Sequence, residues 1–124
     1  MLVNAEKTRA YYAALREEDL CDCAYCRNFR REMAGAYPEV AAYLATLGVE
    51  AEKAFETSPL EPEDGFLPYC GCEYVVFGHC EEDYFHEIGG VTVRPTAFYP
   101  RTGLMEAHFV LSVSPICLPW REDT

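Results

Sequence analysis

Three cysteines, Cys21, Cys23 and Cys26, lie within six consecutive residues of this 124-residue chain. Thiolates are soft ligands for zinc and are also the nucleophiles of thiol redox chemistry, so this thiol run (residues 21–26) predicts a metal site or a reactive cysteine. Three sulfur ligands are one short of a closed tetrahedral zinc site. The sequence has no G-x-S-x-G, no phosphate-binding glycine loop and no H-E-x-x-H. We therefore predict no catalytic residue.

A fourth zinc ligand would come from the second half of the chain. Cys72 is the predicted ligand, with Cys70, Cys80, His79 and His86 as alternatives, and tetrahedral coordination would then tie the two halves together. One residue separates Cys70 from Cys72, where structural zinc sites usually have two, which counts against zinc. In the competing interpretation the cysteines are small apolar fillers beside Phe29 and Met33. An iron–sulfur cluster is disfavoured because the usual tight runs of four cysteines are absent.

The surroundings of the thiol run bear on its reactivity. Asp19 is the expected N-cap of a helix that begins at Leu20, with Asp22 completing a weak capping box. On that helix Cys23 and Cys26 share one face, and Cys21 joins them from the cap region. The helix N-terminus, Arg27 and Arg30 favour thiolates, whereas Glu18, Asp19 and Asp22 oppose them. One low-pKa cysteine could then perform redox or transfer chemistry.

The histidines give weaker signals. The acidic segment 81–83 is flanked by His79, Cys80 and His86. Cys80 and a histidine could form a nucleophilic pair there, or the acidic residues could bind a hard cation. An acidic turn between strands is usually solvated, and we favour that interpretation. His108, on the polar face of a predicted strand, is expected to be a surface residue.

The thiol run belongs to a half of the chain with helical spacing. From Asn4 to about Leu47, apolar residues recur every three to four positions. A first short helix is expected to end at Glu17–Asp19, and a second to carry an apolar stripe from Cys26 to Tyr37. Pro38 and Gly48 should begin and end a third helix, because proline suits the first helical turn and glycine the C-cap.

The second half has the period of β-strands. Residues 73–77 are apolar on both faces and predict a central strand. Gly89-Gly90 predicts a tight hairpin turn between strands 84–88 and 91–94. Strand 107–114 has one core face and one more polar face, and Pro115 and Pro119 should end it.

These signals predict one α+β domain over residues 1–124. It comprises a helical half (4–56), a proline-rich connection without regular structure (57–69) and an antiparallel β half (70–120). Neither half buries much surface alone, so the N-terminal helices are expected to pack on one face of a four-stranded antiparallel sheet.

Composition limits the classes of partner. Half of the residues are apolar and the formal net charge is −11, which predicts a globular protein that repels nucleic acid and anionic membranes. An acidic face could instead bind a basic protein. The start lacks a signal-peptide core, so we expect a cytoplasmic protein whose seven cysteines stay free thiols.

Four segments carry a resemblance to a known family. They are residues 18–29 (EDLCDCAYCRNF), 37–40 (YPEV), 55–62 (FETSPLEP) and 108–111 (HFVL). With its C-D-C-x-x-C-x-N-F motif, the chain resembles a family of small bacterial proteins without an assigned activity. The resemblance implies a stand-alone bacterial domain and transfers no catalytic residue.

The sequence therefore favours a non-enzymatic binding or interaction protein, in which the cysteine cluster either holds a structural zinc or, as we favour, fills space among apolar neighbours. Two alternatives stay open: an acidic inhibitor or immunity-type partner of a basic protein, and a thiol-dependent redox or transfer enzyme.

Overall fold

The structure of the protein is a computed structural model that describes residues 1–122. The helices are α1 (Ala5–Ala14), the short 3-10 helix η1 (Glu17–Asp19), α2 (Ala24–Ala36) and α3 (Pro38–Thr46). The strands are β1 (Leu2–Val3), β2 (Glu56–Pro59), β3 (Phe66–His79), β4 (His86–Ile88), β5 (Val91–Thr96), β6 (His108–Ser114) and β7 (Ile116–Pro119). No helix in residues 1–122 is both long and apolar enough to span a membrane.

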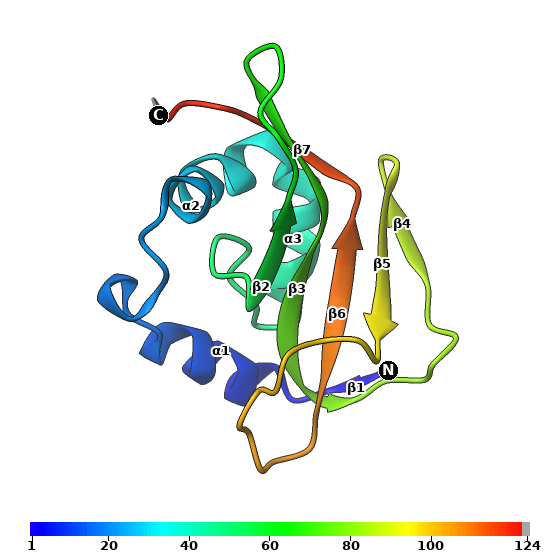
Figure 1. Ribbon diagram of the computed structural model, residues 1–124. Helices are drawn as coiled ribbons and strands as arrows, with labels where there is room; N and C mark the ends of the chain where they lie inside the picture. Colours follow the sequence, from blue (N-terminus) through cyan, green and yellow to red (C-terminus); the bar gives the residue numbers. More distant parts are fainter. Residues whose placement is uncertain (123–124) are drawn as a thin grey trace.

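The sheet is antiparallel and is organised around the long strand β3. Its strand order is β1-β3-β6-β5-β4, and β2 and β7 also pair with β3. Figure 1 shows β3 running the length of the molecule, with α2 and α3 beside it and α1 near its far end. The predicted α+β class is confirmed, but the four-stranded sheet is wrong because residues 1–122 contain seven strands. The additional strands β1, β2 and β7 have two to four residues each, too few to give a periodic signal.

The predicted proline-rich connection is also corrected. Segment 57–69 contains most of β2 and the beginning of β3, which pair through Thr57 and Cys72. The pairing register shifts between Thr57 and Pro59. Proline has no N–H to donate to a neighbouring strand, and it is tolerated at such an irregularity. The Pro68 carbonyl still accepts a hydrogen bond from Leu60 N at 2.9 Å. Pro119 likewise does not end the preceding strand but is the last residue of β7.

Local signals in both halves are confirmed. Gly89 and Gly90 have φ values of +51° and +84° and join β4 to β5. The third helix begins at Pro38, and Gly48, with φ +89°, follows its C-cap. A Cβ atom on Gly48 would lie 2.4 Å from the Ala5 carbonyl oxygen, so α1 and the end of α3 meet where only glycine fits.

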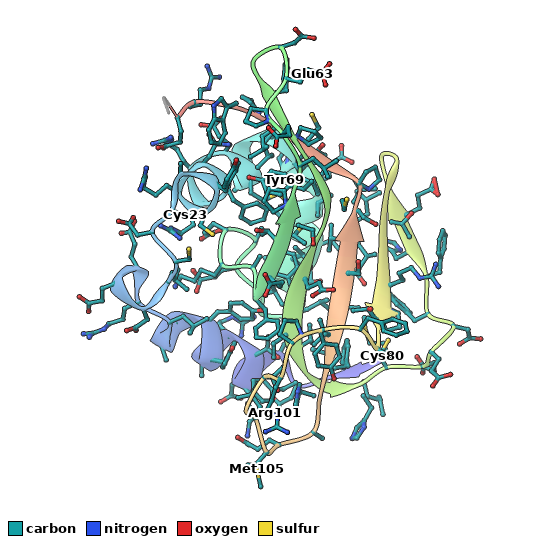
Figure 2. The ribbon with its side chains drawn as sticks, in the orientation of Figure 1. Cys23, Glu63, Tyr69, Cys80, Arg101 and Met105 are labelled. Carbon is teal, nitrogen blue, oxygen red and sulfur yellow. The ribbon has the colours of Figure 1, made fainter. Side chains whose placement is uncertain are left out.

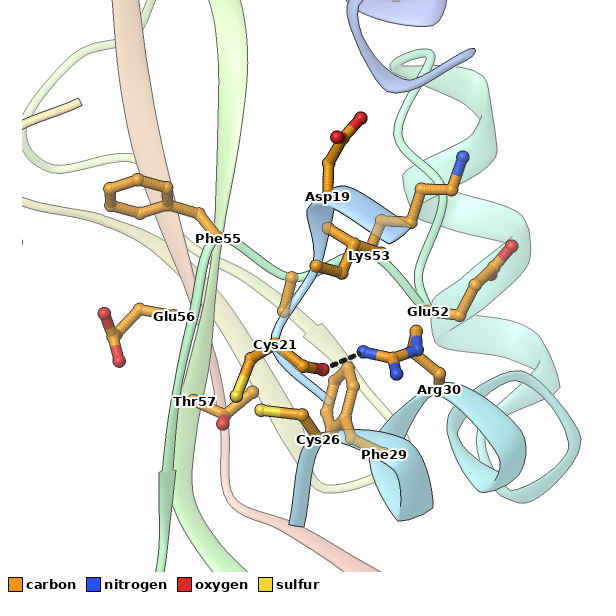
Figure 3. Close-up of a pocket in the computed structure, with 12 residues that line it drawn as sticks. Asp19, Cys21, Cys26, Phe29, Arg30, Glu52, Lys53, Phe55, Glu56 and Thr57 are labelled. Atoms are coloured by element: carbon orange, nitrogen blue, oxygen red, sulfur yellow. Dashed lines mark hydrogen bonds between the residues drawn. The ribbon is translucent and has the colours of Figure 1, made fainter. Parts of the chain in front are cut away.

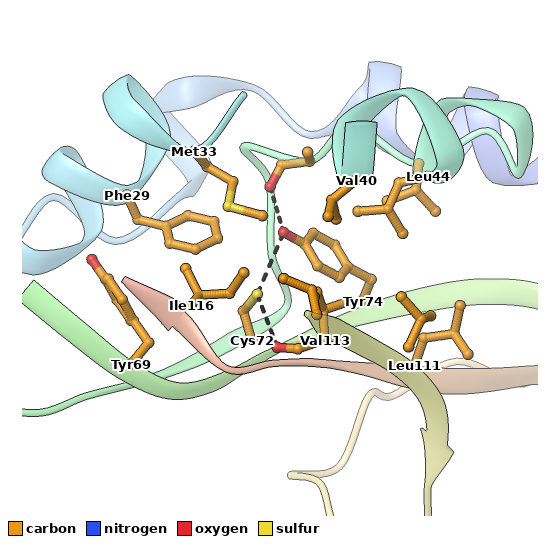
Figure 4. Packing of buried hydrophobic residues seen from close by; sticks show 14 of the residues in the cluster. Phe29, Met33, Val40, Leu44, Tyr69, Cys72, Tyr74, Leu111, Val113 and Ile116 are labelled. Carbon is orange, nitrogen blue, oxygen red and sulfur yellow. Dashed lines mark hydrogen bonds between the residues drawn. The ribbon is translucent and has the colours of Figure 1, made fainter. Parts of the chain in front are cut away.

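The main core lies between the helices and one face of the sheet. Its buried residues include Phe29 and Met33 of α2, Leu44 of α3, and Tyr74 and Leu111 of the sheet (Figure 4). The other face of β3 is covered as well, because Val75, Phe77 and Val110 form a second buried cluster. Residues 73–77 are therefore a central strand, as predicted.

Candidate metal centre

The thiol run lies just before and within the first turn of α2. This helix begins at Ala24, so Cys23 is its N-cap and the Cys23 sulfur accepts a hydrogen bond from the Cys26 N–H at 3.4 Å. The prediction of Asp19 as N-cap is wrong. Asp19 is the last residue of η1, and its carboxylate accepts a hydrogen bond from the Arg16 N–H at 3.3 Å. The carboxylate therefore caps η1 and not α2.

The sulfur atoms of Cys21, Cys23 and Cys26 all lie within 4.8 Å of one another. Tetrahedral coordination with Zn–S bonds of about 2.3 Å places sulfur atoms roughly 3.8 Å apart, and the 4.8 Å limit on the observed separations exceeds that spacing by about 1 Å. Cys21 and Cys23 are exposed and Cys26 is half-buried. Exposure of the first two argues against the apolar-filler interpretation for them.

Two arginines of α2 fix the backbone that carries the exposed cysteines. Arg30 Nη1 donates to the Cys21 carbonyl oxygen at 2.7 Å (Figure 3). Only 15% of the Arg30 side chain is exposed. Arg27 donates to the Asp22 carbonyl oxygen. Asp22 Oδ1 lies 3.9 Å from Arg27 and 3.8 Å from Arg30. These contacts fold the segment before α2 back onto the first turns of the helix.

The sulfurs differ in acidity. Partial burial raises the pKa of Cys23, but hydrogen bonds from the N–H groups of Cys26 and Tyr25 and from the neighbouring thiols outweigh it and hold this pKa below its ordinary value. Burial, followed by the hydrogen bonds and charges of Cys21 and Cys23, raises the pKa of Cys26 to about 12. The cluster therefore holds one thiol disposed to ionise and one that keeps its proton until a cation replaces it.

The predicted fourth ligands lie elsewhere. Cys72 is fully buried in the core, with its sulfur 3.6 Å from the Val113 carbonyl oxygen and 3.7 Å from the Tyr74 hydroxyl (Figure 4). Cys70, the neighbouring candidate on β3, is exposed. Residues 70 and 72 are two apart and would share one face in a regular strand. The partner of β3 changes between Tyr69, which pairs with Ile116 of β7, and Cys72, which pairs with Val113 of β6, and across this break Cys72 is buried while Cys70 is exposed. Burial raises the pKa of Cys72 to about 12, so this thiol stays protonated and fills space.

The remaining candidates come from the end of β3 and from β4. Cys23 and Cys80 lie on opposite sides of the molecule in Figure 2. His79 is the last residue of β3, and the ring of His86 stacks on Tyr43 with centroids 4.6 Å apart. No fourth histidine, cysteine or carboxylate joins the three thiols anywhere in residues 1–122.

The acidic segment 81–83 and His108 are the remaining candidates outside the cluster. The segment 81–83 is exposed, as predicted for a solvated turn. His108 is half-buried, with Nε2 2.9 Å from the Thr102 hydroxyl and Nδ1 2.7 Å from the Glu106 carbonyl oxygen. These contacts hold the loop before β6, so the expectation of a plain surface residue is corrected.

A cavity of about 340 Å³ adjoins the thiols, and sequence reasoning missed it. Its lining includes Cys21, Cys26 and Arg30 on one side and Lys53 and Thr57 on the other. In Figure 3 the Cys21 and Cys26 side chains point toward each other beside Thr57. The far wall comes from the segment that leads into β2, and no local pattern in the sequence places that segment against α2.

Comparison with protein families, curated proteins and solved structures finds no match to this chain. The resemblance to a small bacterial family therefore stays a prediction.

Proposed function

We propose that the protein binds a zinc ion through the thiolates of Cys21, Cys23 and Cys26. One observation carries this proposal: three sulfur atoms lie within 4.8 Å of one another at the start of one helix. Thiolates select thiophilic metals such as zinc over magnesium or calcium. The protein is then a metal-binding protein whose site is built from a single short segment.

The local backbone supports this assignment. The Cys23 sulfur is held at the helix N-terminus, and Arg30 holds the Cys21 carbonyl, so two ligands are positioned before any metal arrives. Positive charge near the sulfurs, from the helix N-terminus, Arg27 and Arg30, offsets the repulsion among three thiolates. Binding releases protons, because zinc is held by thiolates and not by thiols.

Metal analysis of protein purified without chelator tests the proposal. We expect one zinc ion per chain, removable by a strong chelator, and loss of tight binding in Cys21→Ser, Cys23→Ser and Cys26→Ser. Cys117→Ser is the matched control, because Cys117 is exposed on β7 and belongs to no metal-ligand group among residues 1–122. Wild-type protein that binds zinc no better than the triple serine variant would refute the proposal.

A second candidate is thiol–disulfide exchange, which the position of Cys23 favours. Cys23-Ala24-Tyr25-Cys26 is a C-x-x-C sequence at a helix N-terminus, where a thiolate is stabilised. The Cys23 thiolate would attack a substrate disulfide and release one thiolate. Cys26 would then attack the mixed disulfide, leaving a Cys23–Cys26 disulfide and a fully reduced substrate.

Alkylation kinetics of the metal-free protein separate this candidate from zinc binding. Exchange chemistry predicts that iodoacetamide at neutral pH modifies Cys23 much faster than Cys70 or Cys117, which are also exposed. Equal rates at the three positions would remove the candidate and leave zinc binding untouched.

A further inference from the structure

We propose that a small uncharged thiol from outside the chain fills the fourth coordination position of the metal, entering through the cavity beside Cys21 and Cys26. This inference rests on the proposed zinc site and adds the class of ligand that the site accepts.

The ligand set is the first argument. Within residues 1–122, no fourth histidine, cysteine or carboxylate oxygen joins the three sulfurs. Structural zinc sites are closed by four protein ligands, whereas sites with three protein ligands keep one position for an exchangeable ligand. Cys72, the sulfur predicted to close the site, is fully buried in the core and bonds to Val113 and Tyr74. The chain thus builds the open type of site.

The cavity is the second argument, because it gives that position an entry path. Cys21 and Cys26 line it and Cys23 does not, so the three sulfurs present one side to the cavity and the other to the helix N-terminus. The volume of about 340 Å³ is at the lower end of the range found for small-molecule sites, roughly 300–1,000 Å³. A compact ligand of a few heavy atoms therefore fits beside Thr57.

Charge selects the class of ligand. Zinc with three thiolates carries a net charge of −1, and the cavity lining adds two cations, Arg30 and Lys53, against three acids, Asp19, Glu52 and Glu56. Lys53 already bonds to the Tyr12 carbonyl at 2.9 Å and pairs with Glu50 at 3.3 Å. An incoming oxyanion would therefore meet net repulsion in a chain of formal charge −11.

A thiol avoids that repulsion while it enters the cavity, because it is uncharged until its proton leaves at the metal. At the metal it displaces the bound water, forms a Zn–S bond and gives its proton to solvent, since a coordinating thiol is deprotonated outright. The reaction changes no oxidation state. Soft sulfur donors also match a metal already held by thiolates.

Cobalt substitution tests the inference. The metal-free protein is reconstituted with Co²⁺ in a buffer whose only reductant is a phosphine, and its visible spectrum is titrated with 2-mercaptoethanol, acetate and inorganic phosphate. We expect a saturable change with 2-mercaptoethanol only, in which the sulfur-to-cobalt charge-transfer intensity rises by about a third as three thiolates become four. Thr57→Phe should block this response while cobalt stays bound, and Thr57→Ser, which keeps the space, should respond as wild type does.

The outcomes separate the two proposals. Protein that binds no cobalt overturns the metal site and this inference together. Cobalt that binds with a spectrum unchanged by 2-mercaptoethanol overturns the inference alone, as does a response to acetate or phosphate in its place. If Thr57→Phe does not fold, the wild-type titration with the three probes decides the inference.

Discussion

Replacing Arg30 by glutamine should weaken metal binding without unfolding the protein. Arg30 Nη1 donates to the Cys21 carbonyl oxygen at 2.7 Å, and Arg30 Nη2 lies 3.8 Å from Asp22 Oδ1. Cys21 precedes α2, so no helical hydrogen bond holds it in place. Glutamine is shorter and uncharged, so it would not hold the segment 20–22 in place. The Cys21 sulfur could then move away from the sulfur atoms of Cys23 and Cys26.

The size of the effect follows from the lost contact. A hydrogen bond from a charged donor contributes about 1.5–3 kcal/mol. At about 1.4 kcal/mol for each factor of ten, this range corresponds to a roughly 10- to 150-fold loss of zinc affinity. Contacts that orient metal ligands have effects of about 10- to 100-fold, which agrees with this range. Water can replace the arginine at the Cys21 carbonyl, so we expect a value near the lower end, about 10-fold.

Competition against a chromophoric chelator measures this affinity. Arg31→Gln is the matched control, because Arg31 lies on the same helix and bonds to Glu122 and Glu32. We expect the control to bind zinc like the wild type, and circular dichroism should show unchanged helix content in both variants. If Arg30→Gln binds zinc as tightly as Arg31→Gln, the Arg30 contact does not position Cys21 and the reasoning fails.

Three further predictions test the acidity of the site and the core behind it. Because the pKa of Cys26 is raised to about 12, zinc must displace its proton at every pH below that value, so zinc affinity should rise with pH. Chelator competition between roughly pH 6.5 and 8.5 should show zinc affinity increasing about tenfold or more per pH unit. A zinc affinity that does not change with pH would contradict this prediction. Tyr74→Phe removes the hydroxyl that donates to the Ala51 carbonyl at 2.6 Å inside the core, so urea unfolding should report a loss of about 1–3 kcal/mol, and an unchanged midpoint would count against this bond. Leu111→Ala empties a fully buried position and should cost about 2–5 kcal/mol in the same assay, against less than about 0.5 kcal/mol for Met105→Ala at a position that is 98% exposed.

Several features could be predicted from the sequence because neighbouring residues decide them. Pro38 and Gly48 bound α3 through their own backbone preferences, and Gly89-Gly90 makes the turn between β4 and β5 for the same reason. The closeness of the three thiols belongs to this group. Cysteines spread over only six residues are brought together by many conformations of that segment, so their spacing alone indicated a shared site.

Other features depend on partners far along the chain. The strands β1, β2 and β7 are too short to show a period, and they exist because β3 offers them a backbone to pair with. The start of α2 moved from the predicted Leu20 to Ala24 because Asp19 caps η1 instead. Each of these outcomes depends on which strand-pairing or capping contact forms, and the local sequence pattern does not predict that choice.

For this protein, the sequence by itself determined the types of ligand, their short spacing, the α+β class and the best-defined turns. Only the tertiary structure decided that Cys72 faces the core, that Arg30 holds the Cys21 carbonyl and that the segment before β2 forms a cavity against the thiols. The physical reason is range: backbone preferences act over a few residues, whereas burial and strand pairing join segments distant in the chain and are fixed only when the whole core has packed.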